Sequence, residues 1–119
     1  MKSEDVAAKA LKQFEASATP MWIFDIHSLA FLAVNDAAIR RYGFSREEFL
    51  SKTILDIRPA EDIVPLIREE LKEQKHDSDN ELWRHRSSDG RVFAVRITSR
   101  KIAFRGRLAE IVMAQEVEG

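Results

Sequence analysis

The chain has 119 residues, enough for one domain, and 19 basic residues stand against 20 acidic ones, for a net charge of −1. This balance argues against a strongly basic nucleic-acid surface, and the longest apolar run, residues 29–34, is far shorter than the ~20 residues of a membrane helix. The absence of cysteine excludes disulfides, zinc–thiolate sites and thiol nucleophiles.

Residues 4–16 are predicted to form a helix, because apolar side chains recur there at spacings of three and four residues. Ser3 is a suitable N-cap. The apolar stripe is narrow, so this helix needs another surface to lie against. We therefore expect a flanking helix over residues 1–17 and a domain over residues 18–119.

Two short strands are expected next, over residues 21–26 and 29–34, with a turn at residues 25–28. The first is rich in aromatic and β-branched side chains, which favour strands. The second is apolar throughout and ends at an Asn-Asp pair. The two segments are predicted to pair as a hairpin.

Two capped helical segments follow the second strand. Asn35 or Asp36 can begin a short helix, and Gly43 is suited to end it in a left-handed conformation. Ser45 and Glu48 then have the spacing of a capping box, which begins the second segment. These closely spaced signals predict two short helices beside the strands.

A longer helix is expected over residues 60–75, after Arg58-Pro59 interrupts the preceding region. Pro65 falls in its first turn, where the missing N–H costs little. Ile63, Ile67 and Leu71 would share one face. Residues 76–80 are polar and are expected to form a connector.

Three strands are predicted in the C-terminal part, over residues 81–86, 91–101 and 108–117. Asp89-Gly90 favours a type I′ hairpin turn between the first two, and Arg105-Gly106 marks the next turn. The order of elements predicts an α+β domain, in which a five-stranded antiparallel sheet carries short helices on one face.

Five stretches of the chain, in their order along the sequence, resemble those of the PAS (Per-Arnt-Sim) sensory domains. The resemblance covers roughly residues 18–117. They are Phe24-Asp25, Val34-Asn35-x-Ala37, Tyr42-Gly43-Phe44-Ser45-Arg46-Glu47-Glu48-Phe49, Pro59-x-Glu61-Asp62 and Arg84-x-Arg86-x-x-Asp89-Gly90. The likeness is greatest to bacterial sensory-box modules that precede histidine kinase or diguanylate cyclase domains. One departure is Glu116-Val117-Glu118, where relatives end the last strand with Asp-(Ile/Val)-Thr.

The resemblance implies a sensory and signal-transduction module. It would bind a small ligand in an internal pocket and relay the signal to an output domain of the parent protein. The alternative is an interaction module that dimerises and whose pocket is filled by side chains. No enzymatic activity is expected of the domain, because the sequence has no Gly-rich phosphate loop, nucleophile elbow or His-Glu-x-x-His sequence.

Alternation along the strands predicts which strand residues face the pocket, and the helices are expected to contribute Ile54, Ile57, Ile67 and Leu71. The candidate ligand-binding residues are Trp22, Phe24, Ile54, Ile57, Ile67, Leu71, Trp83, His85, Val95, Ile97 and Ser99. Phe93, Val112 and Ala114 should share this inner face. Plain core packing is the alternative for each of them, and a hydrogen-bonded structural role is the alternative for His85. A buried imidazole needs a partner, so we hypothesise that His85 orients a small polar or anionic ligand while Trp83 covers its apolar part.

The ligand or cofactor is not identified by the sequence. Flavin photosensors of this family carry a reactive cysteine in an Asn-Cys-Arg stretch, where this chain has Thr53, Ile54 and Leu55, so no flavin adduct is expected. Haem-binding relatives place a histidine on the long helix, and residues 63–74 contain none, which argues against haem. The three scattered histidines do not predict a metal site.

Apolar residues outside the expected core point to self-association. The candidate interface residues are Val6, Ala10, Phe14, Ile111 and Met113. These surfaces could pack against each other or against a second copy, and a homodimer is expected. The N-terminus lacks the apolar core of a signal peptide, so we expect a cytoplasmic module, which a membrane-anchored sensor can also contain.

Overall fold

A single antiparallel sheet organises the molecule, with its strands in the order β2-β1-β5-β4-β3. The computed structural model describes residues 2–63 and 78–117. The elements are α1 (Lys2–Ala16), β1 (Met21–Asp25), β2 (Phe31–Val34), α2 (Asp36–Tyr42), α3 (Arg46–Leu50), η1 (Ile54–Ile57), η2 (Ala60–Asp62), β3 (Ser78–Arg86), β4 (Val92–Phe104) and β5 (Arg107–Glu116). The predicted fold class is confirmed.

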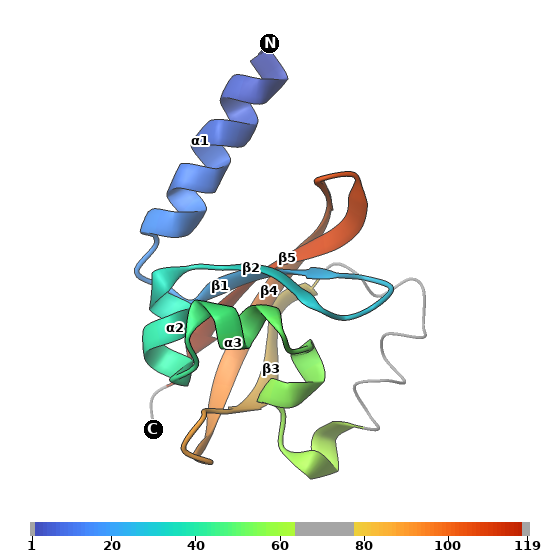
Figure 1. Cartoon of the computed structure of the whole chain (residues 1–119). Helices are drawn as coiled ribbons and strands as arrows, with labels where there is room; N and C mark the ends of the chain where they lie inside the picture. The colour runs from blue at the N-terminus through green and yellow to red at the C-terminus, as the bar shows by residue number, and fades with distance from the viewer. Residues whose placement is uncertain (1, 64–77, 118–119) are drawn as a thin grey trace.

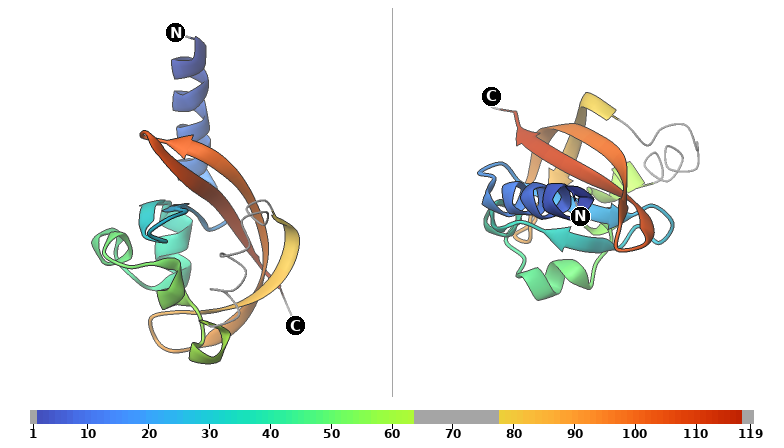
Figure 2. Two further views of the ribbon diagram at one scale, coloured as in Figure 1. Left: turned by 90° about the vertical axis from the view of Figure 1, so that its right-hand side faces the viewer. Right: turned by 90° about the horizontal axis from the view of Figure 1, so that it is seen from above.

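The short helices lie over one face of the curved sheet, and α1 projects from the other end of the domain (Figure 1). Viewed along the sheet edge, α2, α3 and η1 form a layer against its inner side (Figure 2). No helix in the described ranges is both long and apolar enough to cross a membrane.

The predicted caps of the short helices are confirmed. Asn35 caps α2 by accepting a hydrogen bond from the Ala38 N–H, and Gly43 ends the helix with a φ of 84°. Ser45 and Glu48 form the expected capping box of α3. These signals were readable because each involves side chains and backbone within one turn of helix.

The region of the predicted longer helix is described only at its start. Residues 60–62 form the 3₁₀ helix η2, while residues 64–77, including Ile67 and Leu71, lie outside the described residues. The predicted connector over residues 76–80 is wrong for its last part, because β3 begins at Ser78. Ser78 pairs with Ser99, and a bulge follows in which Asn80 takes a φ of 59°.

The turn types in the C-terminal hairpins differ from the prediction. Gly90 has a φ of 88°, but Asp89 is not among the described residues with positive φ, so this is not a type I′ turn. Asp89 instead accepts hydrogen bonds from the Ser87 hydroxyl and the Arg91 N–H. The backbone of a type I′ turn occurs at Arg105-Gly106, where both residues have positive φ.

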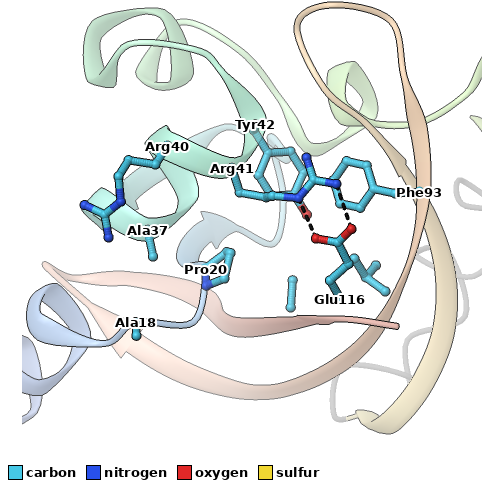
Figure 3. A pocket seen from close by; sticks show the side chains of 10 residues that line it. Ala18, Pro20, Ala37, Arg40, Arg41, Tyr42, Phe93 and Glu116 are labelled. Atoms are coloured by element: carbon cyan, nitrogen blue, oxygen red, sulfur yellow. Dashed lines mark hydrogen bonds and ion pairs between the residues drawn. The ribbon is translucent and has the colours of Figure 1, made fainter. Parts of the chain in front are cut away.

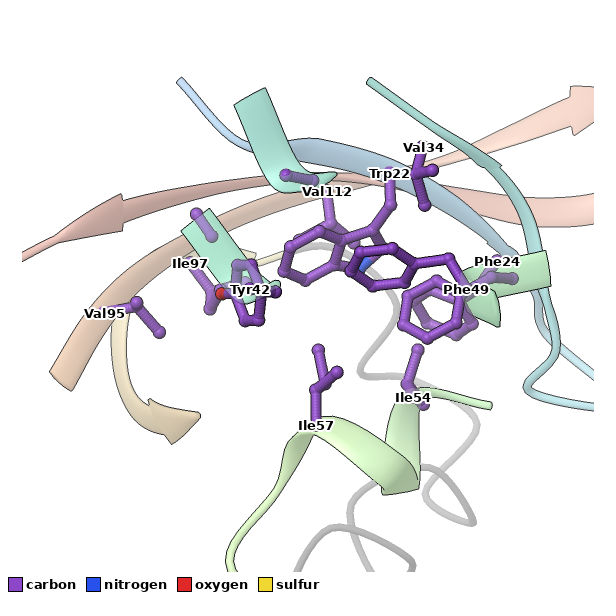
Figure 4. Close-up of a cluster of buried hydrophobic side chains, with 13 residues drawn as sticks. Trp22, Phe24, Val34, Tyr42, Phe49, Ile54, Ile57, Val95, Ile97 and Val112 are labelled. Carbon is purple, nitrogen blue, oxygen red and sulfur yellow. The ribbon is translucent and has the colours of Figure 1, made fainter. Parts of the chain in front are cut away.

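Apolar side chains pack on both faces of the sheet. The inner cluster joins the sheet to the short helices, with Trp22, Tyr42 and Phe49 near its centre (Figure 4). On the outer face, Phe14 of α1 packs against Ile23 and Ala109. The expectation that Phe14 lies outside the core is therefore wrong, because the outer face of β1 and β5 provides a second core.

Candidate functional site

The described candidate ligand-binding residues all belong to the inner layer. Trp22, Phe24, Ile54, Ile57, Val95 and Ile97 are members of the inner apolar cluster, Trp83 packs against it, and His85 and Ser99 are buried. Ile67 and Leu71 lie outside the described residues. Strand alternation, and the helices for Ile54 and Ile57, thus placed these side chains in the inner layer, while a ligand-binding role stays a prediction.

Aromatic rings meet edge to face or at a tilt across the inner layer. The Trp22 ring centroid lies 6.0 Å from that of Phe31, 5.5 Å from that of Tyr42 and 5.6 Å from that of His85. The Tyr42 ring also contacts Phe93, at 5.3 Å. Such ring contacts favour particular relative orientations, so they help to fix the position of the His85 ring.

His85 has a protein partner that the sequence did not reveal. The Tyr42 hydroxyl oxygen and His85 Nδ1 lie 2.5 Å apart and share a hydrogen bond whose donor depends on the histidine tautomer. Burial raises the pKa of Tyr42 far above its ordinary value, so its hydroxyl keeps its proton. We call Tyr42 and His85 the inner polar pair. Because this bond engages Nδ1, His85 has within the protein the partner that a structural role requires, while its role in orienting a ligand stays a prediction.

Arg58 is a second buried polar residue of this layer, and sequence reasoning treated it only as a helix end. Its side chain is buried, and its guanidinium carbon lies 4.2 Å from the centroid of the Trp83 ring. Burial and, next, the Arg58 charge hold the pKa of His85 well below its ordinary value. His85 is therefore neutral at pH 7, and Arg58 supplies a positive charge to the described part of this site.

The arrangement suits recognition better than catalysis. A buried guanidinium, a hydroxyl and an imidazole can bind an anionic or polar group, and Trp83 supplies an apolar face. Within residues 2–63 and 78–117, His, Asp and Glu side chains do not gather in the groups of three that could hold a metal ion.

Asn35 connects the start of the domain to α2. Its side chain is fully buried, and its Oδ1 accepts hydrogen bonds from the N–H groups of Met21 and Ala38. Its Nδ2 donates to the carbonyl oxygens of Phe14 and Thr19. The sequence predicted the cap on Ala38, but the other three bonds reach 14 to 21 residues back along the chain and leave no local pattern.

A groove of about 420 Å³ lies between α2, the start of β4, the end of β5 and the connection after α1 (Figure 3). Across it, Arg41 donates two hydrogen bonds to Glu116, at 2.5 and 2.8 Å. The Arg41 guanidinium also covers the Phe93 ring, 3.7 Å from its centroid. The hydrogen bonds from Arg41 lower the pKa of Glu116. We call Arg41 and Glu116 the exit clamp, because Glu116 ends β5.

The candidate interface residues are divided by the fold. Phe14 is buried, and Ile111 packs beside it in the outer cluster, so these two contact this same chain. Ala10 and Met113 are exposed, while the side chain of Val6 lies outside the described part. The apolar surfaces of the flanking helix and the sheet therefore pack partly against each other.

Comparison with known proteins gives a consistent result. The family model described as PAS fold matches residues 11–117. A PAS domain from a two-component sensor histidine kinase is 28% identical, with 97% of this chain and 99% of that chain covered and a TM-score of 0.78. No curated protein matches the chain.

More distant solved structures show the same fold. A PAS domain from Colwellia psychrerythraea is 13% identical over 94% of this chain and 97% of that chain, with a TM-score of 0.80. A domain of the sensory box sensor histidine kinase/response regulator from Geobacter sulfurreducens is 16% identical, with 92% of each chain covered and a TM-score of 0.73.

Proposed function

The chain belongs to the PAS fold family, and from this we propose that it is the ligand-responsive sensory module of a longer cytoplasmic or membrane-anchored signalling protein. A small molecule held against the inner face of the sheet would favour one conformer of the domain. The change would then pass to an output domain of the histidine kinase or diguanylate cyclase type. The similarity to a PAS domain of a sensor histidine kinase supports the first of these output types.

The observation that carries this proposal is the buried Arg58 beside Trp83 and the inner polar pair. Burying a guanidinium is costly unless other groups compensate, and stacking on an indole provides part of that compensation. The electrostatic influence of Arg58 extends to both Tyr42 and His85. A cation kept in the inner layer is therefore well placed to select the charge of a ligand.

The ligand class that fits these groups is a small carboxylate with an apolar part. A planar guanidinium binds a carboxylate through parallel hydrogen bonds, and the Trp83 ring can cover an apolar body. This assignment moves the ligand-reading role from His85 to Arg58, with His85 holding Tyr42 in place. A ligand can shift the domain only by the difference between its affinities for the two conformers.

Native mass spectrometry of the purified full chain tests the proposal, followed by calorimetry with a panel of small carboxylates. We expect a retained small molecule or a carboxylate that binds, and about tenfold weaker binding in Arg58→Gln, as befits the loss of a charged hydrogen bond. Arg86→Gln is the matched control, because Arg86 is exposed on β3. Wild-type chain that carries no small molecule and binds no carboxylate would contradict the proposal.

Assembly without a ligand is the second candidate, and exposed apolar residues on the outer face favour it. Met113 and Leu82 are 36% and 55% exposed, respectively, on strands whose inward positions are filled by neighbours in sequence. If this face joins two copies, Met113→Glu should weaken self-association in sedimentation. Leu50→Glu, which alters an exposed leucine of α3, should not.

A further inference from the structure

The tip of the β4–β5 hairpin is a basic projection of the domain. Residues 100–109 contain four basic residues and no acidic one, in a chain whose net charge is −1. The hairpin extends past β1, whose pairing with β5 ends at Asp25 and Ala109. It points to the same end of the molecule from which α1 projects (Figure 1 and Figure 2). A large flat partner can therefore reach this tip.

A groove of about 370 Å³ lies beside the tip and is lined by Leu32, Phe104, Arg105 and Arg107. Leu32 and Phe104 pack against the outer apolar cluster, so they give the groove apolar walls. The Arg105 guanidinium carbon lies 4.6 Å from the centroid of the Phe104 ring, which holds this charge close to the apolar surface. The groove therefore joins two cationic side chains to two apolar ones.

Both arginines keep N–H donors available to a ligand. Arg105 is exposed, and it forms no ion pair with the described residues. Arg107 donates one hydrogen bond from Nη1 to Asp25, at 3.0 Å, yet its side chain is 60% exposed. The Asp25 carboxylate is buried and also accepts hydrogen bonds from the N–H groups of His27 and Ser28. Asp25 thus holds Arg107 at the groove, while the rest of the guanidinium faces solvent.

The other two basic residues of the segment contribute less to the charge of the tip. Arg100 forms an ion pair with Asp79, and Lys101 lies opposite Glu110 in the sheet. An acidic neighbour offsets much of the field of each cation. The capacity to bind an anion therefore rests on the two arginines of the groove.

An anionic membrane surface fits this combination better than a small soluble anion. The planar guanidinium of arginine binds phosphate oxygens through paired hydrogen bonds. The apolar layer beneath the lipid headgroups can accept the apolar side chains that lie beside the arginines. Leu108, which directly follows Arg107, is 53% exposed and offers an apolar contact that a small anion would not use.

We propose that the tip of the β4–β5 hairpin docks the domain on a membrane surface, by binding the phosphate groups of anionic phospholipids between Arg105 and Arg107. Such docking is weak and reversible, because each basic residue near an anionic surface strengthens binding only about fivefold. It gains effect when other parts of a longer protein hold the domain close to the membrane. The inference goes beyond the proposed sensory function and requires no ligand in the inner layer.

Cosedimentation of the full chain with lipid vesicles tests the proposal. Phosphatidylcholine vesicles with about 30% phosphatidylglycerol should bind the chain at about 0.05 M salt, whereas pure phosphatidylcholine vesicles should not. Arg105→Gln should weaken this binding about fivefold, and Leu108→Gln about two- to fivefold. Arg91→Gln is the matched control, because it removes one exposed charge from the turn at the other end of β4. It should change the binding less than about twofold.

Arg107 needs two variants, because its loss also removes a hydrogen bond to Asp25. Arg107→Gln should weaken vesicle binding about fivefold, and Arg107→Lys, which keeps the charge, should bind within about twofold of wild type. A lysine variant that folds but binds as weakly as the glutamine variant would contradict a role for the charge.

The proposal is overturned if the wild-type chain does not bind the anionic vesicles, or if Arg105→Gln and Arg91→Gln weaken binding equally. It is also overturned if inorganic phosphate displaces the chain from the vesicles at constant ionic strength, since the groove would then take a soluble anion. These measurements use the chain without a ligand in the inner layer. Their failure therefore leaves the carboxylate-binding test intact, and a chain that binds no carboxylate can still dock on vesicles.

Discussion

The two ends of α2 hold the two ends of the domain by opposite chemistry. At its start, the neutral side chain of Asn35 is fully buried and makes hydrogen bonds to four backbone groups of the incoming chain and of α2 itself. At its last turn, the charged Arg41 binds Glu116 at a half-exposed groove. The hydrogen bonds of Asn35 are therefore costly to break, whereas the Arg41–Glu116 ion pair can open at little cost.

Solvent explains the difference. Loss of a buried hydrogen-bonding partner leaves groups that water cannot reach, so each carries its full desolvation cost. A half-exposed ion pair that opens is rehydrated at once, and its net contribution is small. The comparison therefore predicts large, salt-independent effects at the start of α2 and small, salt-dependent effects at its end.

The largest effect is expected for Asn35→Ala. It leaves two N–H groups and two carbonyl groups without their partner, and we expect a loss of about 3–4 kcal/mol in unfolding free energy. Asn35→Ser is the control, because serine can cap α2 but is too short for the remaining bonds. Since a cap alone contributes about 1 kcal/mol, the serine variant should keep most of the loss in urea unfolding. Full recovery by serine would reduce this junction to an ordinary cap.

Substitution of Gly43 tests whether a change in the backbone at the end of α2 costs as little stability as loss of the Arg41–Glu116 ion pair. Its φ is 84°, and a Cβ at this position would clash with the Ser88 hydroxyl. Gly43→Ala should destabilise by about 2–3 kcal/mol, against about 1 kcal/mol for Gly90→Ala. Gly90 has a similar φ of 88° but no atom within 4 Å of its Cβ position, so it isolates the backbone term. Equal urea midpoints for the two variants would show that the Ser88 contact relaxes freely.

Between the two ends, the inner polar pair predicts a pH dependence. Folding keeps His85 neutral, while the unfolded chain binds a proton below its ordinary pKa near 6.5. Acidification therefore favours the unfolded state, and the stability present above pH 6.5 falls by about 1 kcal/mol between pH 6.5 and pH 5.5. Denaturation of His85→Phe should lack this component. Parallel pH profiles of variant and wild type would mean that His85 binds a proton as readily in the folded chain as in the unfolded chain.

The smallest effect is expected for Glu116→Gln. Because both partners of the clamp are about half exposed, we expect a loss of about 0.5 kcal/mol in unfolding free energy, which 0.5 M salt should largely remove. Arg46→Gln should show a similar salt-dependent loss from its exposed ion pair with Asp36, together with a salt-independent loss of the hydrogen bond that Arg46 donates to the Val34 carbonyl oxygen. A loss above about 2 kcal/mol in Glu116→Gln would show that the ion pair is as costly to break as the buried hydrogen bonds of Asn35, and would contradict the comparison.

The sequence alone determined the features that depend on neighbouring residues. The caps at Asn35, Gly43 and Ser45 act within one turn of helix, and alternation along β1 and β4 placed Trp22, Val95 and Ile97 on the inner face. Such features follow from backbone geometry, which repeats every two residues in a strand and every 3.6 in a helix. The family resemblance rested on these same local patterns.

Only the tertiary structure decided which distant side chains meet. Tyr42 and His85 are 43 residues apart, and Arg41 and Glu116 are 75 apart, so their pairing depends on how α2 docks on the sheet and on strand register. The same docking gave Asn35 its long-range bonds, and the packing of α1 gave Phe14 a core of its own. A residue's type and local spacing carry no record of such partners, because a hydrogen bond or apolar contact needs only proximity in space.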